Sequence, residues 1–184
     1  MPEKLLEALR QYMPKDASEQ EFRLKMIKLL EANGTKAFNR STYPAHFTAS
    51  GWLINSEASK ALLIHHKKLN KWLQPGGHAD GETDLFKVVC KEVFEETGLQ
   101  YFNQIEDSVF DIDIHAIPAR PNKPAHEHYD VRFLFITRPG DQVVINGESL
   151  SFKWIELENI ASLTDNRSIK RMAEKSLILI HDGY

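Results

Sequence analysis

Cysteine is almost absent from this chain of 184 residues, which contains Cys90 alone. A single cysteine excludes an intramolecular disulfide, and it excludes a zinc site built on the cysteines of one chain. Long apolar runs are also missing, because no stretch approaches the roughly 20 apolar residues that a transmembrane helix needs. The first residues mix acidic and basic side chains into their apolar pattern, unlike a secretion signal. These absences predict a cytoplasmic location and no membrane partner.

A large excess of charge of either sign is lacking as well. The chain has 23 Lys and Arg against 26 Asp and Glu, which gives a formal net charge of −3. Such a chain presents no broad cationic field for a nucleic-acid backbone, although a local patch could bind a phosphorylated small molecule. We therefore expect a small, nucleotide-like substrate and no nucleic-acid polymer as partner.

The first part of the chain has a helical pattern. Apolar residues recur at helical spacing up to Gly34, which predicts a helical hairpin over residues 1–38. Ser18 and Glu21 offer a capping box for the second helix of this hairpin. Residues 39–184 are predicted to form the main domain. The hairpin also offers a surface for a homodimer.

Short apolar runs after the hairpin have the length of β strands. These runs, separated by polar turns, cover residues 46–55, 60–66, 108–118, 128–137 and 151–157. A helical pattern lies between Thr83 and Thr97, and another runs from Asn166 to Ile180. This order of elements predicts an α+β fold, an α/β/α sandwich around a mixed β sheet.

Three glutamates stand on one face of the helix predicted between Thr83 and Thr97. Glu92, Glu95 and Glu96 stand at helical offsets of zero, three and four, so their carboxylates project from the same side. Like charges at this spacing repel each other, whereas a cation bound between the carboxylates would attract all of them and offset this repulsion. Mg²⁺ prefers oxygen ligands, and Mn²⁺ is the alternative ion. A solvated acidic face is the competing interpretation.

The segment around these glutamates resembles the signature of the Nudix hydrolase family. That signature is Gly, five residues, Glu, seven residues, then Arg-Glu-apolar-any-Glu-Glu-any-Gly-apolar, and its counterpart here is GGHADGETDLFKVVCKEVFEETGL. Gly77 corresponds to the leading Gly, and Gly98 to the closing Gly. A Leu-Gln-Pro-Gly-Gly-His segment, typical of one branch of these hydrolases, and the order of strands extend the resemblance over residues 45–184.

Two positions depart from the signature. Thr83 stands where the family has its first Glu, and Glu82 lies one residue earlier. Lys91 stands where the family has Arg, and a Lys cannot reproduce the two-pronged pairing of Arg with a carboxylate. A Nudix-fold ligand-binding or regulatory domain without turnover is therefore the first alternative.

The resemblance implies a Nudix-type Mg²⁺-dependent pyrophosphohydrolase that cleaves a phosphoanhydride bond in a nucleoside diphosphate linked to another group. Its metal ligands would be Glu92, Glu95 and Glu96, and its general base would be Glu92, Glu95 or Glu148. Further residues are expected to contact the substrate, namely Gly77, His78, Arg120 and Arg132. Structural ion pairs are the equal alternative for the two arginines.

Histidines are the second clue to function. His126 and His128 are two positions apart, so both rings lie on the same side of a strand, as a pair of transition-metal ligands requires. His78 and His115 are expected near the same pocket mouth. A histidine-based transition-metal enzyme is thus the second alternative function, and ordinary structural or surface histidines are the competing interpretation.

Overall fold

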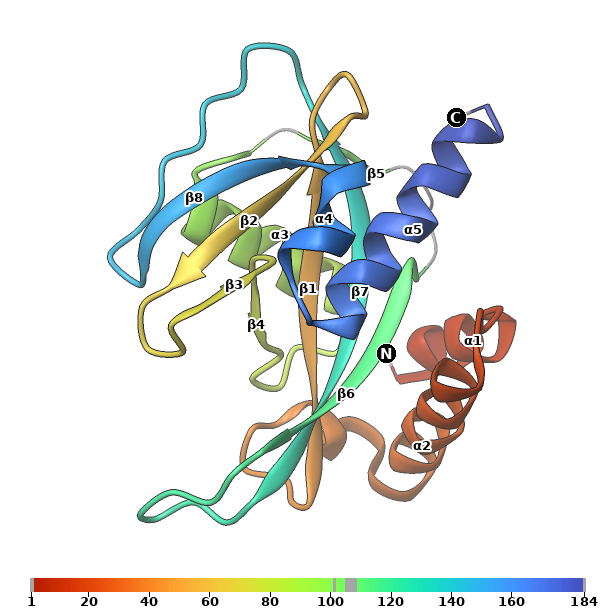
Figure 1. Ribbon diagram of the computed structural model, residues 1–184. Coiled ribbons are helices and arrows are strands. Elements are labelled where there is room, and N and C mark those ends of the chain that lie inside the picture. The colour runs from red at the N-terminus through yellow and green to blue at the C-terminus, as the bar shows by residue number, and fades with distance from the viewer. Residues whose placement is uncertain (1, 101, 105–108, 184) are drawn as a thin grey trace. The chain divides into compact units, whose positions relative to one another are not determined.

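The computed structural model describes residues 2–100, 102–104 and 109–183 (Figure 1). The chain divides into two compact units, each assembled from several segments. The first unit contains Met1–Ser50, Gly76–Lys91 and Glu106–Phe133. The second unit contains Gly51–Pro75, Glu92–Ile105 and Leu134–Tyr184.

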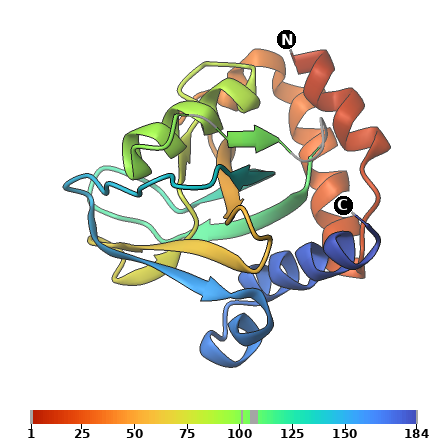
Figure 2. The same ribbon diagram turned by 90° about the horizontal axis from the view of Figure 1, so that it is seen from above.

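The N-terminal helices belong to the first unit. They are α1 (Pro2–Gln11) and α2 (Ala17–Asn33), followed by the 3-10 helix η1 (Gly34–Phe38). Figure 2 shows α1 and α2 side by side, and α2 also contacts the strand β6 described below. Leu9 of α1 and Met26 of α2 are fully buried, which explains why the apolar residues recur at helical spacing.

Helix α2 begins at a different cap from the one predicted. The Asp16 carboxylate accepts a hydrogen bond of 2.8 Å from the backbone N–H of Glu19, and the Glu19 carboxylate accepts one of 2.6 Å from the N–H of Lys15. The capping box therefore uses Asp16 and Glu19, and the prediction for Ser18 and Glu21 was wrong. Asp and Ser are about equally good N-caps, and the earlier start lets the buried Glu19 carboxylate accept a hydrogen bond from the backbone N–H of Lys15.

Four strands contribute to the first unit. They are β4 (Gly76–His78), β6 (Asp111–Ile117) and the first parts of β1 (Ala45–Ile54) and β7 (His126–Thr137). Strand β4 pairs antiparallel with β1, and β6 pairs antiparallel with β7. Strands β1 and β7 continue into the second unit.

Gly76 is required by the close approach of β4 to β1. A Cβ atom at Gly76 would clash with the Cβ of Ser50 and would lie 2.6 Å from the carbonyl oxygen of Ala49. Any side chain at this position would displace the backbone of β1. Gly76 thus permits β4 to pair with β1.

The second unit contains the remaining strands and two helices. They are β2 (Lys60–His66), β3 (Lys71–Leu73), β5 (Phe102–Gln104), β8 (Ser149–Glu156), α4 (Leu157–Leu163) and α5 (Arg167–His181). Strand β2 pairs with β8, β3 and the end of β1, while β5 pairs with the end of β7. Helix α5 contacts α4, and its Ser176 accepts a buried hydrogen bond of 2.9 Å from the indole N–H of Trp52 on β1.

The strands follow the order β3-β2-β1-β7-β5, with β4, β6 and β8 paired to β1, β7 and β2. Together with the helices, this mixed sheet confirms the predicted α+β class and the N-terminal helix pair. Strands β3, β4 and β5 and helix α4 were not predicted, because they are too short to show a hydrophobic period. None of the helices in the described part of the chain has the length and hydropathy that crossing a bilayer requires. The domain boundary after residue 38 stays a prediction.

Candidate functional site

Helix α3 (Leu85–Thr97) carries the three predicted metal ligands, which are buried to different extents. Glu96 is buried, with 5% of its surface exposed, while Glu92 is half-buried and Glu95 is exposed. Each of the three takes part in further interactions within the protein. Their helical spacing agrees with the sequence, and their role as metal ligands stays a prediction.

The glycine that closes the signature is required at the end of α3. Gly98 adopts a φ of +71°, a conformation that favours glycine, and its N–H donates a hydrogen bond of 2.8 Å to the carbonyl of Phe94. The carbonyl of Thr97 accepts a hydrogen bond of 2.8 Å from the N–H of Val144. A Cβ at Gly98 would lie 3.3 Å from the Cβ of Val144. The helix therefore ends in a tight contact with this loop.

Three further positions of the predicted site are exposed. Glu82 precedes α3 and accepts a hydrogen bond of 2.9 Å from the backbone N–H of Asp84. Lys91 lies on the helix itself, and Glu148 lies in the turn before β8, where its carbonyl accepts a hydrogen bond of 2.9 Å from the N–H of Lys67. The structure thus gives Glu82 a local contact at the start of the helix, and the predicted roles of all three remain predictions.

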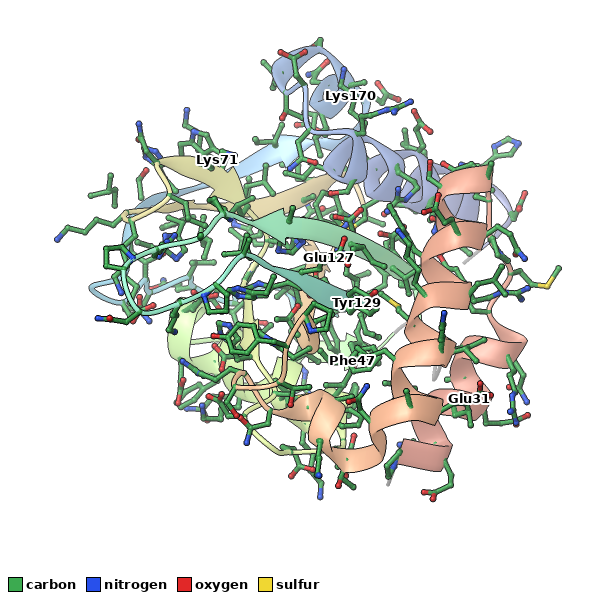
Figure 3. The ribbon with its side chains drawn as sticks, turned by 90° about the horizontal axis from the view of Figure 1, so that it is seen from below. Glu31, Phe47, Lys71, Glu127, Tyr129 and Lys170 are labelled. Atoms are coloured by element: carbon green, nitrogen blue, oxygen red, sulfur yellow. The ribbon has the colours of Figure 1, made fainter. Side chains whose placement is uncertain are left out.

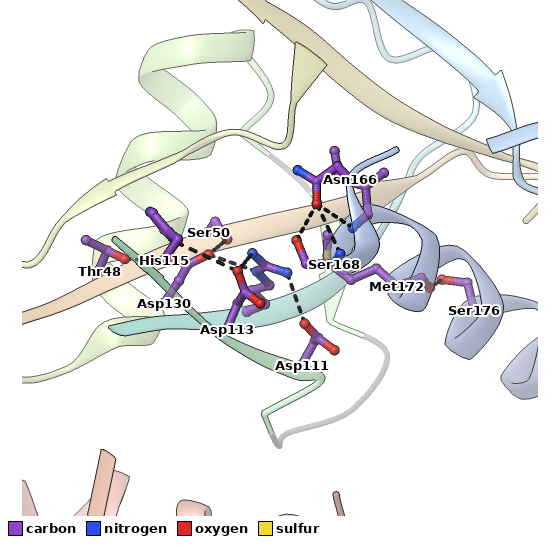
Figure 4. Close-up of polar contacts among 12 residues, drawn as sticks. Thr48, Ser50, Asp111, Asp113, His115, Asp130, Asn166, Ser168, Met172 and Ser176 are labelled. Atoms are coloured by element: carbon purple, nitrogen blue, oxygen red, sulfur yellow. Dashed lines mark hydrogen bonds and ion pairs between the residues drawn. The ribbon is translucent and has the colours of Figure 1, made fainter. Parts of the chain in front are cut away.

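One face of the first unit's strands is polar, and a buried aspartate joins two of these strands. Asp130 on β7 accepts a hydrogen bond of 2.9 Å from the hydroxyl of Thr48 and one of 2.7 Å from the hydroxyl of Ser50 (Figure 4). Thr48 and Ser50 stand on β1 two positions apart, so both side chains project from the same face. All three side chains are buried.

Arg132 is buried at one end of this polar face, with 3% of its surface exposed. Its guanidinium donates hydrogen bonds of 2.8 Å to Asp130, 3.1 Å to Asp111 and 3.2 Å to Asp113. Burial by itself lowers the pKa of Arg132, but attraction by the three carboxylates outweighs burial and raises the pKa above its usual range. This placement favours a structural ion pair over the predicted substrate contact. Arg120, by contrast, is exposed in the β6–β7 connection.

The opposite face of the same strands is apolar. The rings of Phe47 and Tyr129 pack edge to face with their centroids 6.0 Å apart (Figure 3). Both residues are buried, and burial raises the pKa of Tyr129 to about 12. Alternation along β1 and β7 therefore places the aromatic core on one side and the polar residues on the other.

Three histidines from three strands meet on the polar face. They are His46 on β1, His78 on β4 and His128 on β7, and one ring nitrogen of each lies within 4.8 Å of those of the other two. The ring centroids are 4.9 Å apart for His46 and His128, and 4.8 Å apart for His78 and His128. His46 is buried, and the other two are half-buried. We call these three residues the histidine cluster.

The surroundings of the histidine cluster favour neutral imidazoles. Burial lowers the pKa of His78 to about 4 and that of His128 to about 2. The positive charge of Arg40 adds to the effect at His78, and neighbouring histidines contribute to both shifts. Burial also lowers the pKa of His46. All three rings are therefore uncharged near neutral pH. Each then retains one nitrogen lone pair that can accept a hydrogen bond or bind a metal.

His78 and His128 were predicted from the sequence to lie close together, and His46 was not. His126 was predicted to pair with His128, and its ring centroid lies 5.2 Å from that of His128, but its Nδ1 lies 2.9 Å from the carbonyl of Pro124. The structure therefore brings His46 into the cluster and leaves His126 beside it. His115 also lies nearby, with its ring centroid 5.3 Å from that of His128. The alternating polar residues His46, Thr48 and Ser50 were the signal that could have indicated this face.

Comparisons with known proteins agree with the strand order and with the signature. The model of the NUDIX domain family matches residues 44–175, which leaves helices α1 and α2 outside the match. No curated protein matches the chain significantly.

Several solved structures are similar to this chain. A C. elegans Ap4A hydrolase binary complex has a TM-score of 0.61 and 18% identity, over 74% of this chain and 98% of its own. A NUDIX family hydrolase from Clostridium perfringens has a TM-score of 0.53 and 25% identity, over 73% of this chain and 97% of its own. The MutT protein from Methanosarcina mazei has a TM-score of 0.56 and 18% identity, over 72% and 93%. The chain therefore belongs to the NUDIX domain family, which confirms the family resemblance predicted from its sequence.

Proposed function

We propose that this protein is a Mg²⁺-dependent hydrolase that cleaves a phosphoanhydride bond in a nucleoside diphosphate linked to another group. The observation that carries the proposal is the family match over residues 44–175, which includes the whole glycine-bounded segment from Gly77 to Gly98. The name of the C. elegans Ap4A hydrolase supports a nucleotide-like substrate. A homodimer and a cytoplasmic location are further predictions that accompany this function.

The donor set on α3 fits a hard divalent cation. Glu92, Glu95 and Glu96 supply carboxylate oxygens from one side of a helix, within about one turn. Mg²⁺ favours such oxygen donors and keeps positions for water and for phosphate oxygens, and Mn²⁺ is the alternative ion. When bound, the ion would neutralise charge on the diphosphate and lower the pKa of a water molecule.

The chain's own residues would hold the substrate and accept the proton of the attacking water. A general base must lie within hydrogen-bonding reach of that water. The candidates are Glu92 and Glu95 on α3 and Glu148 before β8. Gly77 and His78 on β4, together with the exposed Arg120, are the proposed substrate contacts, and Glu82 and Lys91 are weaker candidates for a role in the site.

The decisive experiment is a panel of nucleoside diphosphate derivatives incubated with the purified protein and Mg²⁺. We expect hydrolysis of at least one compound, with a loss of about 100-fold or more in kcat for Glu96→Gln, because the carboxylate charge is removed. The exposed Glu158 on α4 gives a matched control, and Glu158→Gln should keep the wild-type rate.

Lys91, in the place of the family's Arg, supports the alternative of a ligand-binding or regulatory domain. Tight binding of a nucleotide without any product, for wild type and Glu96→Gln alike, would contradict the hydrolase and support this alternative. If Glu96→Gln hydrolysed the substrate as fast as Glu158→Gln, Glu96 would have no part in the catalytic site.

A further inference from the structure

We propose that the histidine cluster binds Zn²⁺ and forms a second metal site, which shares no ligand with the glutamates of α3. The three ligands are His46, His78 and His128. A fourth position would remain for water or for an oxygen atom of a bound molecule, as in zinc sites with three protein ligands.

Strand pairing in the sheet brings the three histidines close together. β4 pairs with β1 so that His78 stands opposite Thr48, two positions from His46. His128 stands on β7, which is adjacent to β1 in the strand order. Their ligand nitrogens lie within 4.8 Å of one another. A tetrahedral zinc with bonds of about 2.0 to 2.1 Å separates ligand nitrogens by about 3.4 Å, so small ring rotations would close the site.

Two ring nitrogens in the cluster are left without a hydrogen bond by the residues that the structure describes. The Nε2 atoms of His46 and His128 are buried and have no hydrogen-bond partner within the described part of the chain. A buried polar atom without a partner costs about 1 to 3 kcal/mol, and such atoms in a native protein call for an explanation. A metal ion bound through the lone pairs of both nitrogens would explain why they lack a hydrogen-bond partner.

The hydrogen bond that His46 donates selects the ring tautomer that zinc needs. Its Nδ1 lies 3.2 Å from the carbonyl oxygen of Thr42, which can only accept, so Nδ1 carries the proton and Nε2 keeps its lone pair. Metal-bound histidines are usually oriented by such a bond from the second ring nitrogen to a carbonyl or carboxylate. His46 is thus prepared as a ligand through Nε2.

The donor chemistry favours zinc over magnesium. Neutral imidazoles suit Zn²⁺ and its transition-metal neighbours, whereas Mg²⁺ selects oxygen donors. The nearby cation Arg40 is held by an ion pair with Asp80, so the charge that would oppose a metal is partly compensated. The cluster and the α3 glutamates therefore suit two different ions.

Isothermal titration of the chelator-treated full chain with Zn²⁺, in excess Mg²⁺, tests the proposal. We expect one zinc per chain, and each of His46→Asn, His78→Asn and His128→Asn should weaken binding by more than about 100-fold, since even outer-shell partners of a metal are worth about 10- to 100-fold. The exposed His181 on α5 gives the matched control, and His181→Asn should bind zinc like wild type. His126→Asn should also retain binding, because His126 lies outside the cluster.

A measurement on the wild-type chain avoids any variant that fails to fold. The imidazole nitrogens of all eight histidines can be followed by NMR during the zinc titration. Large shifts confined to His46, His78 and His128 support the site. Shifts confined to other histidines, or unaltered affinity in the three cluster variants, would overturn it. Hydrolysis with Mg²⁺ is measured separately, so failure of the zinc site is distinguishable from failure of the proposed function.

Discussion

Ser50 on β1 donates a hydrogen bond of 2.7 Å to Asp130 on β7, and both side chains are buried. The Asp130 carboxylate also accepts a hydrogen bond from Arg132. Asp130 therefore connects the two strands to a buried ion cluster. These strands also carry His46 and His128. The Ser50–Asp130 contact therefore helps to set the distance between two of the proposed zinc ligands.

Arg132→Met should strongly destabilise the protein. The substitution removes the buried cation that is hydrogen-bonded to Asp111, Asp113 and Asp130. Breaking a buried ion pair by removing one partner costs about 3 to 5 kcal/mol. Urea denaturation measures the free energy of unfolding. The exposed Arg120 provides the control, and an Arg132→Met midpoint equal to that of Arg120→Met would contradict the structural role of the cluster.

Gly76→Ala should be poorly tolerated, whereas Gly147→Ala should have little effect. The added methyl group at Gly76 meets the backbone and Cβ of β1, and overpacking of this kind costs about 1 to 3 kcal/mol or more. Among the described residues, no atom beyond Gly147 and its two chain neighbours lies within 4 Å of a Cβ at Gly147. Thermal unfolding followed by circular dichroism compares the two variants. Equal melting temperatures would show that β4 does not approach β1 this closely.

Ser176→Ala should lower the free energy of unfolding by about 1 to 3 kcal/mol, because the buried N–H of Trp52 loses its acceptor. Ser162→Ala is the matched control, since Ser162 is exposed and its hydroxyl donates only to the carbonyl of Asn159 among the described residues. Chemical denaturation followed by tryptophan fluorescence gives both values. A loss in Ser162→Ala as large as that in Ser176→Ala would argue against the Trp52 contact.

Asp16→Ala should cost about 0.5 to 2 kcal/mol, the usual effect of removing an N-cap. Ser18→Ala should be nearly neutral, because Ser18 is exposed within the first turn of α2. Guanidinium denaturation of the two variants compares the caps directly. If Ser18→Ala proved the more damaging substitution, the helix would begin where the sequence pattern predicted.

Local patterns were enough to predict α3 and the helices that begin and end the chain. The spacing of Glu92, Glu95 and Glu96 and the Gly98 stop are properties of a few neighbouring residues, and helical geometry follows from such neighbours. The apolar face of a helix is equally local. The three-residue strands β3, β4 and β5 could not be predicted from local patterns, because they form only by pairing with longer strands.

The sequence by itself determined the family, the α+β class and the row of carboxylates on α3, because each of these depends on short-range spacing. Tertiary structure alone decided that Arg132 is held by three aspartates and that His46 joins His78 and His128. Thr48 and Asp130, which bond across the same face, lie 82 positions apart in the chain. Contacts over such distances depend on which strands pair and in which register, and a one-residue shift of register would turn every one of these side chains to the opposite face.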